Sequence, residues 1–281
     1  MKYNETFPGA SSLIRGQVPA SSILLLGPPG IGKTIFSKQF ILNGLQQNEP
    51  CIYVTTDESP KEFQNSFKIF NYDIKPFIEK ERIRLVDCYS WKIGGASSNK
   101  YVVSNPTDLT AISKVIEEAR KGYEKFRFVV DSITGLSSAS GDDPLLKFIQ
   151  IVSGKIKSFE GKAIFTVDPG SHSEHFLNIL RRSMDGTIEM KAQETENEMV
   201  RLMRVFSLRG TRHRTTWTPF EITDEGIVIK TETGLRCVLC SKPINWEPYI
   251  ENIDGKEYYF DQEECAKTYR KFREIYGQYF E

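Results

Sequence analysis

The segment GPPGIGKT, from Gly27 to Thr34, holds the residues with the clearest chemical potential in the sequence. It fits the pattern G-x-x-x-x-G-K-S/T and lies between an apolar run and a segment with helical periodicity, the context that the pattern requires. Glycines there let backbone N–H groups curl around phosphate oxygens, and the N-terminus of the following helix adds partial positive charge. The segment therefore predicts a phosphate-binding loop, in which Lys33 reaches the β- and γ-phosphates of a nucleotide and the Thr34 hydroxyl binds Mg²⁺.

A carboxylate is expected at the end of another buried strand, because phosphoryl-transfer sites combine the phosphate loop with an acid at that position. The segment RFVVDS, residues 127–132, supplies it in Asp131. We predict that Asp131 holds the water shell of Mg²⁺. The alternative is that Asp131 only caps a loop.

Two adjacent carboxylates, Asp57 and Glu58, follow the apolar run CIYVT. In a phosphate-loop protein this edge of the sheet faces the nucleotide, and a carboxylate there can orient or deprotonate the attacking water. A structural reason exists only for their neighbours, since Ser59 and Glu62 form a capping box with Pro60 at the first helical position,. We therefore interpret Asp57 and Glu58 as water-handling acids.

Three of the five cysteines, Cys237, Cys240 and Cys265, lie in the last fifth of the chain. In a reducing compartment such a cluster indicates metal binding before a disulfide. Cys-x-x-Cys is a standard zinc half-site, and Asp261 and Cys265 share a helix face at i and i+4. The four side chains predict a Cys₃Asp zinc site, unless the three cysteines are incidental.

These residues need a scaffold, and the chain up to about residue 230 alternates segments of strand and helix character. That alternation predicts an α/β fold with a mostly parallel sheet and helices on both faces, extended by antiparallel strands after Asp185. We expect one domain over 1–230 and a small module over 235–281, with Ser/Gly-rich loops at 90–100 and 132–143. The strands are expected at 22–26, 51–55, 83–88, 127–132 and 162–167, and the helices at 33–47, 60–70, 107–123 and 144–159.

The composition excludes several classes. Charged residues make up 26% of the 281 residues, and the net charge is formally zero, unlike a protein that coats nucleic acid. A basic stretch, 201–214, could grip phosphates,, but the two Ser/Gly-rich loops carry few cations and little stacking surface, so nucleic-acid binding is not favoured. No apolar run approaches the roughly 18–20 residues that span a bilayer. We therefore expect a cytoplasmic protein without a membrane segment.

Together GPPGIGKT, YVTTDESP, VVDS and the later FSLRGTRH and TPFEITDEGIVI resemble the RecA superfamily, most closely its KaiC/RadA-type branch in the single-domain archaeal form. The resemblance covers residues from about 7 to 230 and implies a RecA-like phosphate-loop ATPase. It implies ATP as the ligand, with contacts from Gly27, Pro28, Pro29, Gly30, Ile31, Gly32, Lys33, Thr34, Ile35 and Asp131.

The same resemblance concerns oligomers. Its "KLRGT" pattern reads here Ser207 to Thr211, so Arg209 matches an arginine that reaches the nucleotide of a neighbouring subunit, while Ser207 replaces the lysine. A homo-oligomer, expected as a hexameric ring, is therefore implied. Where the family usually has glutamate, this chain has the shorter Asp57. Two other functions stay open: an ATP-binding switch with little or no hydrolysis, and a recombinase-like accessory protein that binds DNA.

The segment from Cys237 onward resembles the small TRASH/YHS-type zinc modules, with Asp261 in place of their usual cysteine. The resemblance implies Zn²⁺, either as a structural ion or as a sensed one. It also implies docking of an unknown protein partner through this module.

Overall fold

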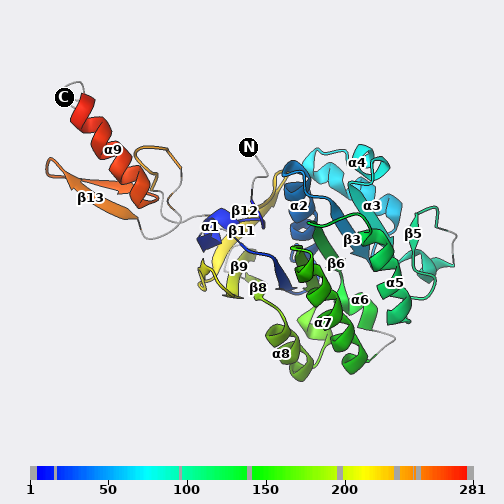
Figure 1. Ribbon diagram of the computed structural model, residues 1–281. Coiled ribbons are helices and arrows are strands. Elements are labelled where there is room, and N and C mark those ends of the chain that lie inside the picture. The colour runs from blue at the N-terminus through cyan, green and yellow to red at the C-terminus, as the bar shows by residue number, and fades with distance from the viewer. Residues whose placement is uncertain are drawn as a thin grey trace.

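The computed structural model describes residues 5–15, 18–94, 97–137, 141–194, 199–230, 235–242, 244 and 248–276. Over these ranges the main body is a ten-stranded sheet in the order β12-β11-β9-β8-β2-β7-β6-β3-β4-β5 (Figure 1). The strands that pair in parallel are β2 (Ser21–Leu26), β3 (Cys51–Thr55), β4 (Ile83–Asp87), β5 (Tyr101–Val102), β6 (Arg127–Asp131), β7 (Lys162–Val167) and β8 (Gly186–Glu194). The antiparallel extension comprises β9 (Met199–Leu208), β11 (Thr218–Thr223) and β12 (Gly226–Ile229).

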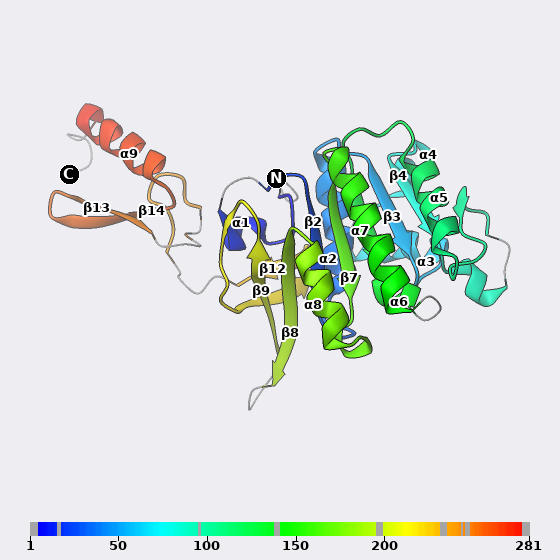
Figure 2. The same ribbon diagram turned by 60° about the horizontal axis from the view of Figure 1, so that its bottom comes forward.

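Helices cover both faces of the parallel part of this sheet, which explains why β2, β3, β6 and β7 are nearly continuous buried runs,. In β2, Ile23 and Leu25 belong to one buried cluster, and Leu24 and Leu26 to the cluster on the other face. Figure 2 shows helices of one face, among them α7 (Asp142–Ser158) and α8 (Glu174–Ser183), in front of the strands. The first face carries α2 (Lys33–Gln46), α3 (Pro60–Ser66), the 3₁₀ turn η1 (Phe67–Phe70) and α4 (Lys75–Glu79); the second carries α5 (Leu109–Arg120), α6 (Ile133–Ser137), α7 (Asp142–Ser158) and α8 (Glu174–Ser183).

Short elements complete the domain. A two-residue strand, β1 (Ile14–Arg15), pairs with β10 (Arg212–His213) and follows α1 (Ala10–Leu13). The turns η2 (Ser90–Ile93) and η3 (Pro169–Ser171) come after β4 and β7. No helix within the described ranges is long and apolar enough to cross a membrane.

The predicted α/β fold with a mostly parallel sheet is confirmed. Helix ends differ from expectation for local reasons. Asp108 is the cap of α5, accepting from the backbone N–H groups of Thr110 and Ala111. The expected helix over 60–70 ends as an α-helix at Ser66 and continues as η1. Prediction of loops at 90–100 and 132–143 was partly wrong, since η2 lies in the first and α6 and the start of α7 lie in the second.

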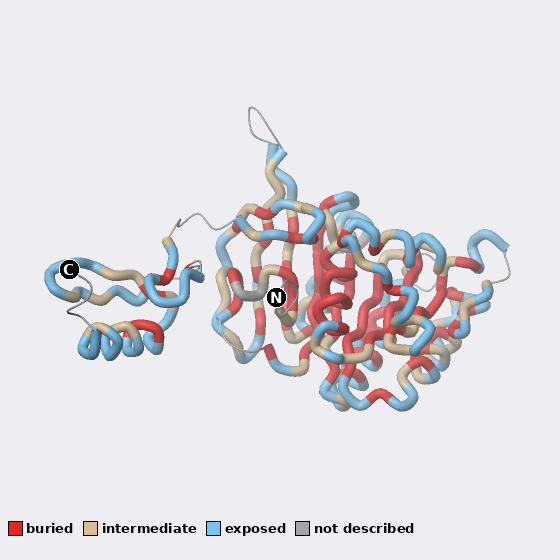
Figure 3. The backbone as a smooth tube through the Cα atoms, turned by 90° about the horizontal axis from the view of Figure 1, so that it is seen from above, coloured by how far each residue is buried: buried red, intermediate tan, exposed pale blue. Residues whose placement is uncertain are grey.

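The C-terminal module has its own small core. A hairpin of β13 (Tyr249–Ile253) and β14 (Lys256–Phe260) packs against α9 (Glu263–Tyr276). Figure 3 shows the contrast in burial between this mostly exposed module and the sheet domain. The predicted boundary near 230 falls beside residues 231–234, which lie outside the described residues. The buried cluster consists of Cys237, Ile244, Phe260, Cys265 and Ala266.

Candidate functional site

A cavity of about 590 Å³ opens at the carboxyl ends of β2, β3, β6 and β7. This edge is where ligands bind in open α/β sheets, and the volume is within the range of roughly 300–1,000 Å³ typical of ligand pockets. Six segments far apart in the sequence meet there: the loop before α2 with the start of that helix, the residues after β3, η2, the end of β6 with α6, the residue after β7, and β11. The lining consists of Pro29, Gly30, Gly32, Lys33, Thr34, Ile35, Asp57, Lys92, Asp131, Ser132, Thr134, Gly135, Asp168 and Ile222.

Glycines shape the loop between β2 and α2. Gly30 has φ of 75° and Gly32 has φ of 117°, a region that side chains rarely adopt. A Cβ on Gly27 would lie 3.0 Å from the carbonyl oxygen of Met190, so the backbone passes too close to β8 for a larger residue. Glycine thus suits this loop where φ is positive and where the backbone passes close to β8, and α2 starts directly after it at Lys33.

The ammonium group of Lys33 is held inside the loop. Its Nζ donates to the carbonyl oxygens of Gly27, at 2.5 Å, and of Pro28, at 2.9 Å. Burial lowers the pKa of Lys33, and the nearby carboxylates of Asp168 and Asp131 act in the opposite direction. An anionic phosphate beside Lys33 would offset the cost of this burial and favour the protonated ammonium group.

The Asp131 carboxylate is fixed by two hydroxyl groups. Tyr53 Oη donates to Oδ2 at 2.7 Å and Thr166 Oγ1 donates to Oδ1 at 2.6 Å. Burial raises the pKa of Tyr53 well above its ordinary value, and the charge of Asp131 adds to the effect, so this phenol remains a donor. Asp131 and Thr34 line the same cavity. Carboxylate and hydroxyl oxygens are the donors that Mg²⁺ prefers.

The two adjacent acids point to different places. Asp57 lines the cavity, and its Oδ2 accepts from Ser132 Oγ at 3.0 Å. Glu58 does not line it: its Oε2 pairs with Lys38 Nζ at 2.7 Å, and the Lys38 side chain is 3% exposed. Burial raises the pKa of Glu58, and Lys38 acts against that rise. Of the pair, only Asp57 faces the space where a phosphate would lie.

The remaining predicted nucleotide contacts lie behind the surface of the cavity. The carbonyl oxygens of Gly27 and Pro28 accept hydrogen bonds from Lys33, and neither residue lines the cavity. Ile31 is buried in the core. Arg209 follows β9; its backbone N–H donates to Asp185, and its Nη2 donates to the carbonyl oxygen of Arg182 at 3.2 Å. It does not line the cavity of its own chain.

Sequence reasoning missed several lining residues. Asp168 follows β7 at the same edge as Asp131, so its position after a buried strand was a usable signal. Ser132 directly follows the predicted acid, and Thr134 lies three positions after it, so both could have been predicted in the same way. Lys92 and Ile222 gave no signal, because only the three-dimensional path of the chain brings them to the cavity.

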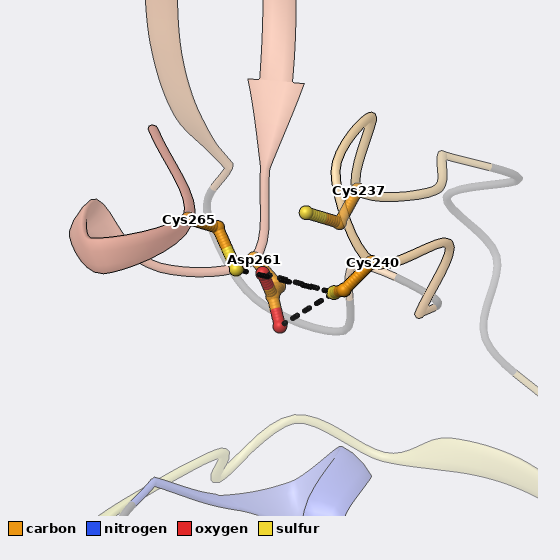
Figure 4. A group of neighbouring side chains, drawn as sticks. All are labelled: Cys237, Cys240, Asp261 and Cys265. Atoms are coloured by element: carbon orange, nitrogen blue, oxygen red, sulfur yellow. Dashed lines mark hydrogen bonds between the residues drawn. The ribbon is translucent and has the colours of Figure 1, made fainter. Parts of the chain in front are cut away.

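The predicted metal ligands do converge (Figure 4). The ligand atoms of Cys237, Cys240, Asp261 and Cys265 all lie within 4.8 Å of one another. Cys240 Sγ lies 3.6 Å from Asp261 Oδ1 and 4.0 Å from Cys265 Sγ. A tetrahedral zinc site with Zn–S of about 2.3 Å places its sulfur atoms about 3.8 Å apart, so the four side chains fit the ion.

Ionisation in this cluster follows its burial. Burial raises the pKa of Cys265 to about 12, with a further contribution from Asp261. Burial also acts to raise the pKa of Asp261, but hydrogen bonds from the cysteines outweigh it and hold that pKa below its ordinary value. A carboxylate beside three thiols is a ligand set that a divalent cation matches.

The fold and the cavity define a phosphate-loop nucleotide-binding protein with a RecA-like sheet. A family model described as the KaiC ATPase matches residues 8–234, so the chain belongs to the KaiC family of ATPases. A UPF0273 protein of Thermotoga maritima is 34% identical over 234 residues, covering 81% of this chain and 95% of that relative. Another from Pyrococcus horikoshii is 33% identical over 236 residues, covering 82% of this chain and 94% of the relative.

A solved structure agrees. The crystal structure of a KaiC-like protein from Pyrococcus horikoshii matches with a TM-score of 0.62 and 26% identity, covering 80% of this chain and 96% of the other. The predicted resemblance and the RecA-like fold are therefore confirmed. A UPF0273 protein of Saccharolobus solfataricus is 28% identical over 264 residues, covering 92% of this chain and 91% of that relative.

Proposed function

We propose that this protein binds ATP with Mg²⁺ in the cavity at the carboxyl edge of the sheet and hydrolyses it, acting as a homo-oligomeric regulatory ATPase of the cytoplasm. One observation supports this most directly: Lys33, Thr34, Asp131 and Asp57 converge on a single cavity of suitable size. Together they supply a cation for phosphate, two oxygen ligands for a metal and an acid for water. Membership of the KaiC family agrees with it.

Each group has a separate task in this proposal. Lys33 binds the β- and γ-phosphates, and the open backbone N–H groups of the loop bind their oxygens. Thr34 and Asp131 hold Mg²⁺ and its water shell; the bound ion neutralises charge that develops on the phosphates. Asp57, held by the Ser132 hydroxyl, orients the attacking water.

Arg209 would act on the nucleotide of an adjacent subunit. It lies on the exposed turn after β9 and away from its own cavity. An arginine supplied in trans stabilises charge in the transition state and contributes about 10³–10⁵ in rate. A ring, expected as a hexamer, would bring the turn of one subunit to the cavity of the next.

Mixed oligomers test the enzyme and the trans arginine together. Lys33→Ala should abolish ATP binding, whereas Arg209→Ala should bind ATP but lose hydrolysis. Mixing the two variants should restore ATPase activity, since one supplies the arginine and the other the intact cavity. Arg212→Ala, on the neighbouring exposed strand, is the matched control and should remain active. Buffer-level activity of the wild-type protein, measured after sizing with ATP and Mg²⁺, would sink the enzyme proposal.

A second function is favoured by the position of Glu58. Because Glu58 is engaged by Lys38 outside the cavity, the shorter Asp57 is left to handle water. The protein would then work as an ATP-dependent switch with slow or negligible turnover. Single-turnover hydrolysis separates the two functions: an ATP-bound protein without detectable turnover supports the switch.

For the C-terminal module we propose a zinc site formed by the three cysteines and Asp261, which folds the module for docking of a protein partner. The matching distances between ligand atoms support it. Metal analysis of protein purified without chelators should find about one equivalent of zinc. Asp261→Ala should lower zinc affinity, while Glu264→Ala, in the first turn of the helix that follows, should not. Zinc below about a tenth of an equivalent would contradict the site.

A further inference from the structure

The cavity contains a second cation, outside the phosphate loop. Lys92 lines it together with Lys33 and Asp57. Its Nζ donates to the carbonyl oxygen of Thr56 at 2.7 Å and lies 3.7 Å from Asp57 Oδ1. The Lys92 side chain is 40% exposed, so the ammonium group is accessible from the cavity while it neutralises the carboxylate.

Lys92 reaches this position because the end of β4 organises the turn that carries it. The buried Asp87 carboxylate accepts from the backbone N–H groups of Tyr89 and Ser90 and from the hydroxyls of Ser90 and Ser97. The Lys92 backbone N–H donates to the Tyr89 carbonyl oxygen at 2.8 Å. Burial acts to raise the pKa of Asp87, but these donors hold it below its ordinary value, so the turn is kept intact by a carboxylate at neutral pH.

The ion pair between Lys92 and Asp57 is one that a phosphate can replace. Both side chains are partly exposed, at 40% and 58%, and pairs in such surroundings contribute little stability. A terminal phosphate carries more negative charge than a carboxylate and offers three oxygens to the three donors of an ammonium group. Asp57 would keep its bond from Ser132 after the exchange, so it stays in place.

We propose that Lys92 recognises the terminal phosphate: it exchanges its ion pair with Asp57 for the γ-phosphate of a bound nucleoside triphosphate, which favours ATP over ADP and leaves Asp57 to orient water. This inference rests on the nucleotide site proposed above. Lys33 and Lys92 would then hold the phosphate chain from two elements, the loop before α2 and the turn after β4.

Nucleotide affinity of the full chain tests this, measured by calorimetry with a non-hydrolysable ATP analogue and with ADP, both with Mg²⁺. Lys92→Ala should lower the affinity for the triphosphate analogue by about tenfold and leave the affinity for ADP unchanged. Lys92→Arg should restore most of the preference, because it keeps the charge. Lys100→Ala, in the same segment but paired with Glu81, is the matched control and should bind both nucleotides as the wild type does.

Asp57→Asn gives a second readout that a merely structural lysine would not move. It releases Lys92, so triphosphate affinity should rise by a few-fold, and this gain should vanish in the double variant with Lys92→Ala. Equal loss of ATP and ADP affinity in Lys92→Ala, or no loss of either, overturns the inference while the nucleotide site stands. Failure of the wild-type protein to bind either nucleotide overturns both.

Discussion

The sheet domain and the C-terminal module hold their polar sites in opposite ways. In the domain, apolar clusters on both faces of the sheet fix the strands, and the strand ends then present Asp57 and Asp131. Among its described residues the module buries a cluster of five, two of which, Cys237 and Cys265, are predicted metal ligands. A core of that size cannot stabilise a fold alone. The nucleotide site should therefore be formed before its ligand binds, whereas the module should need its metal to fold.

Metal removal tests this contrast with the largest expected effect. Chelation should unfold the module, because a structural zinc contributes about 10–16 kcal/mol to folding of small zinc domains. Amide hydrogen exchange over β13, β14 and α9 should lose its protection, while nucleotide affinity of the sheet domain stays unchanged. Cys265→Ser should act like chelation. Retained protection in metal-free protein would show that the small core suffices.

Within the sheet domain, the largest effect should come from the fully buried Arg127. Its Nε donates to Glu49 Oε2 at 2.6 Å, and its Nη1 donates to the carbonyl oxygens of Thr6 and Phe40. Glu49→Gln would leave a buried guanidinium without its counter-charge, so we expect a loss of about 3–5 kcal/mol in the free energy of unfolding at pH 7. Urea denaturation measures it. Glu221→Gln, which breaks the exposed pair with Lys230, should change stability by less than about 1 kcal/mol.

The same pair gives the domain a defined dependence on pH. Burial acts to raise the pKa of Glu49, but Arg127 and Lys162 outweigh it and hold that pKa below the ordinary value of 4.5. A carboxyl group whose pKa is lowered by folding contributes stability at pH values above its unfolded-state pKa. That contribution is lost as the pH falls through its folded-state pKa. The difference in unfolding free energy between the wild type and Glu49→Gln should thus become smaller below pH 4.5. An equal deficit at pH 7 and at low pH would contradict the charge assignment.

Substitutions of the adjacent acids Asp57 and Glu58 should have smaller effects, one mainly on stability and the other mainly on activity. Glu58→Gln removes the charge that pairs with the buried Lys38, so we expect a loss of about 1–3 kcal/mol in the free energy of unfolding. The ATPase turnover of this variant should fall less than that of Asp57→Asn. Asp57 is mostly exposed, and its side chain interacts with Lys92 and with the Ser132 hydroxyl. Asp57→Asn should therefore leave the free energy of unfolding nearly unchanged. Thermal unfolding and steady-state ATPase assays on both variants measure this. The reverse pattern would mean that Glu58 handles the water.

Much of the sheet domain could be predicted from the sequence, because continuous apolar runs such as Ser21–Leu26 and the phosphate-loop pattern are local signals. The direction of a side chain after a strand is not a local property. Asp57 and Glu58 are adjacent, yet only the position of Lys38 on α2 decides which of them turns away from the cavity. Lys92 arrives through a turn built by Asp87, which no spacing pattern encodes. The convergence of Cys237, Cys240, Asp261 and Cys265 could be predicted because Cys-x-x-Cys is itself a spacing rule,.

The smallest expected effect concerns the cap of α3, which starts immediately after the paired acids. Ser59 Oγ accepts from the Glu62 backbone N–H at 3.3 Å, and the Glu62 carboxylate accepts from the Ser59 backbone N–H at 2.8 Å. Ser59→Ala should lower the free energy of unfolding by about 1 kcal/mol without changing nucleotide affinity, because Asp57 is held by Ser132 and not by the cap. Ser173→Ala removes the equivalent cap of α8 and should cost a similar amount. Loss of ATP affinity in Ser59→Ala alone would show that the start of α3 positions Asp57, and the helix cap would then belong to the nucleotide site.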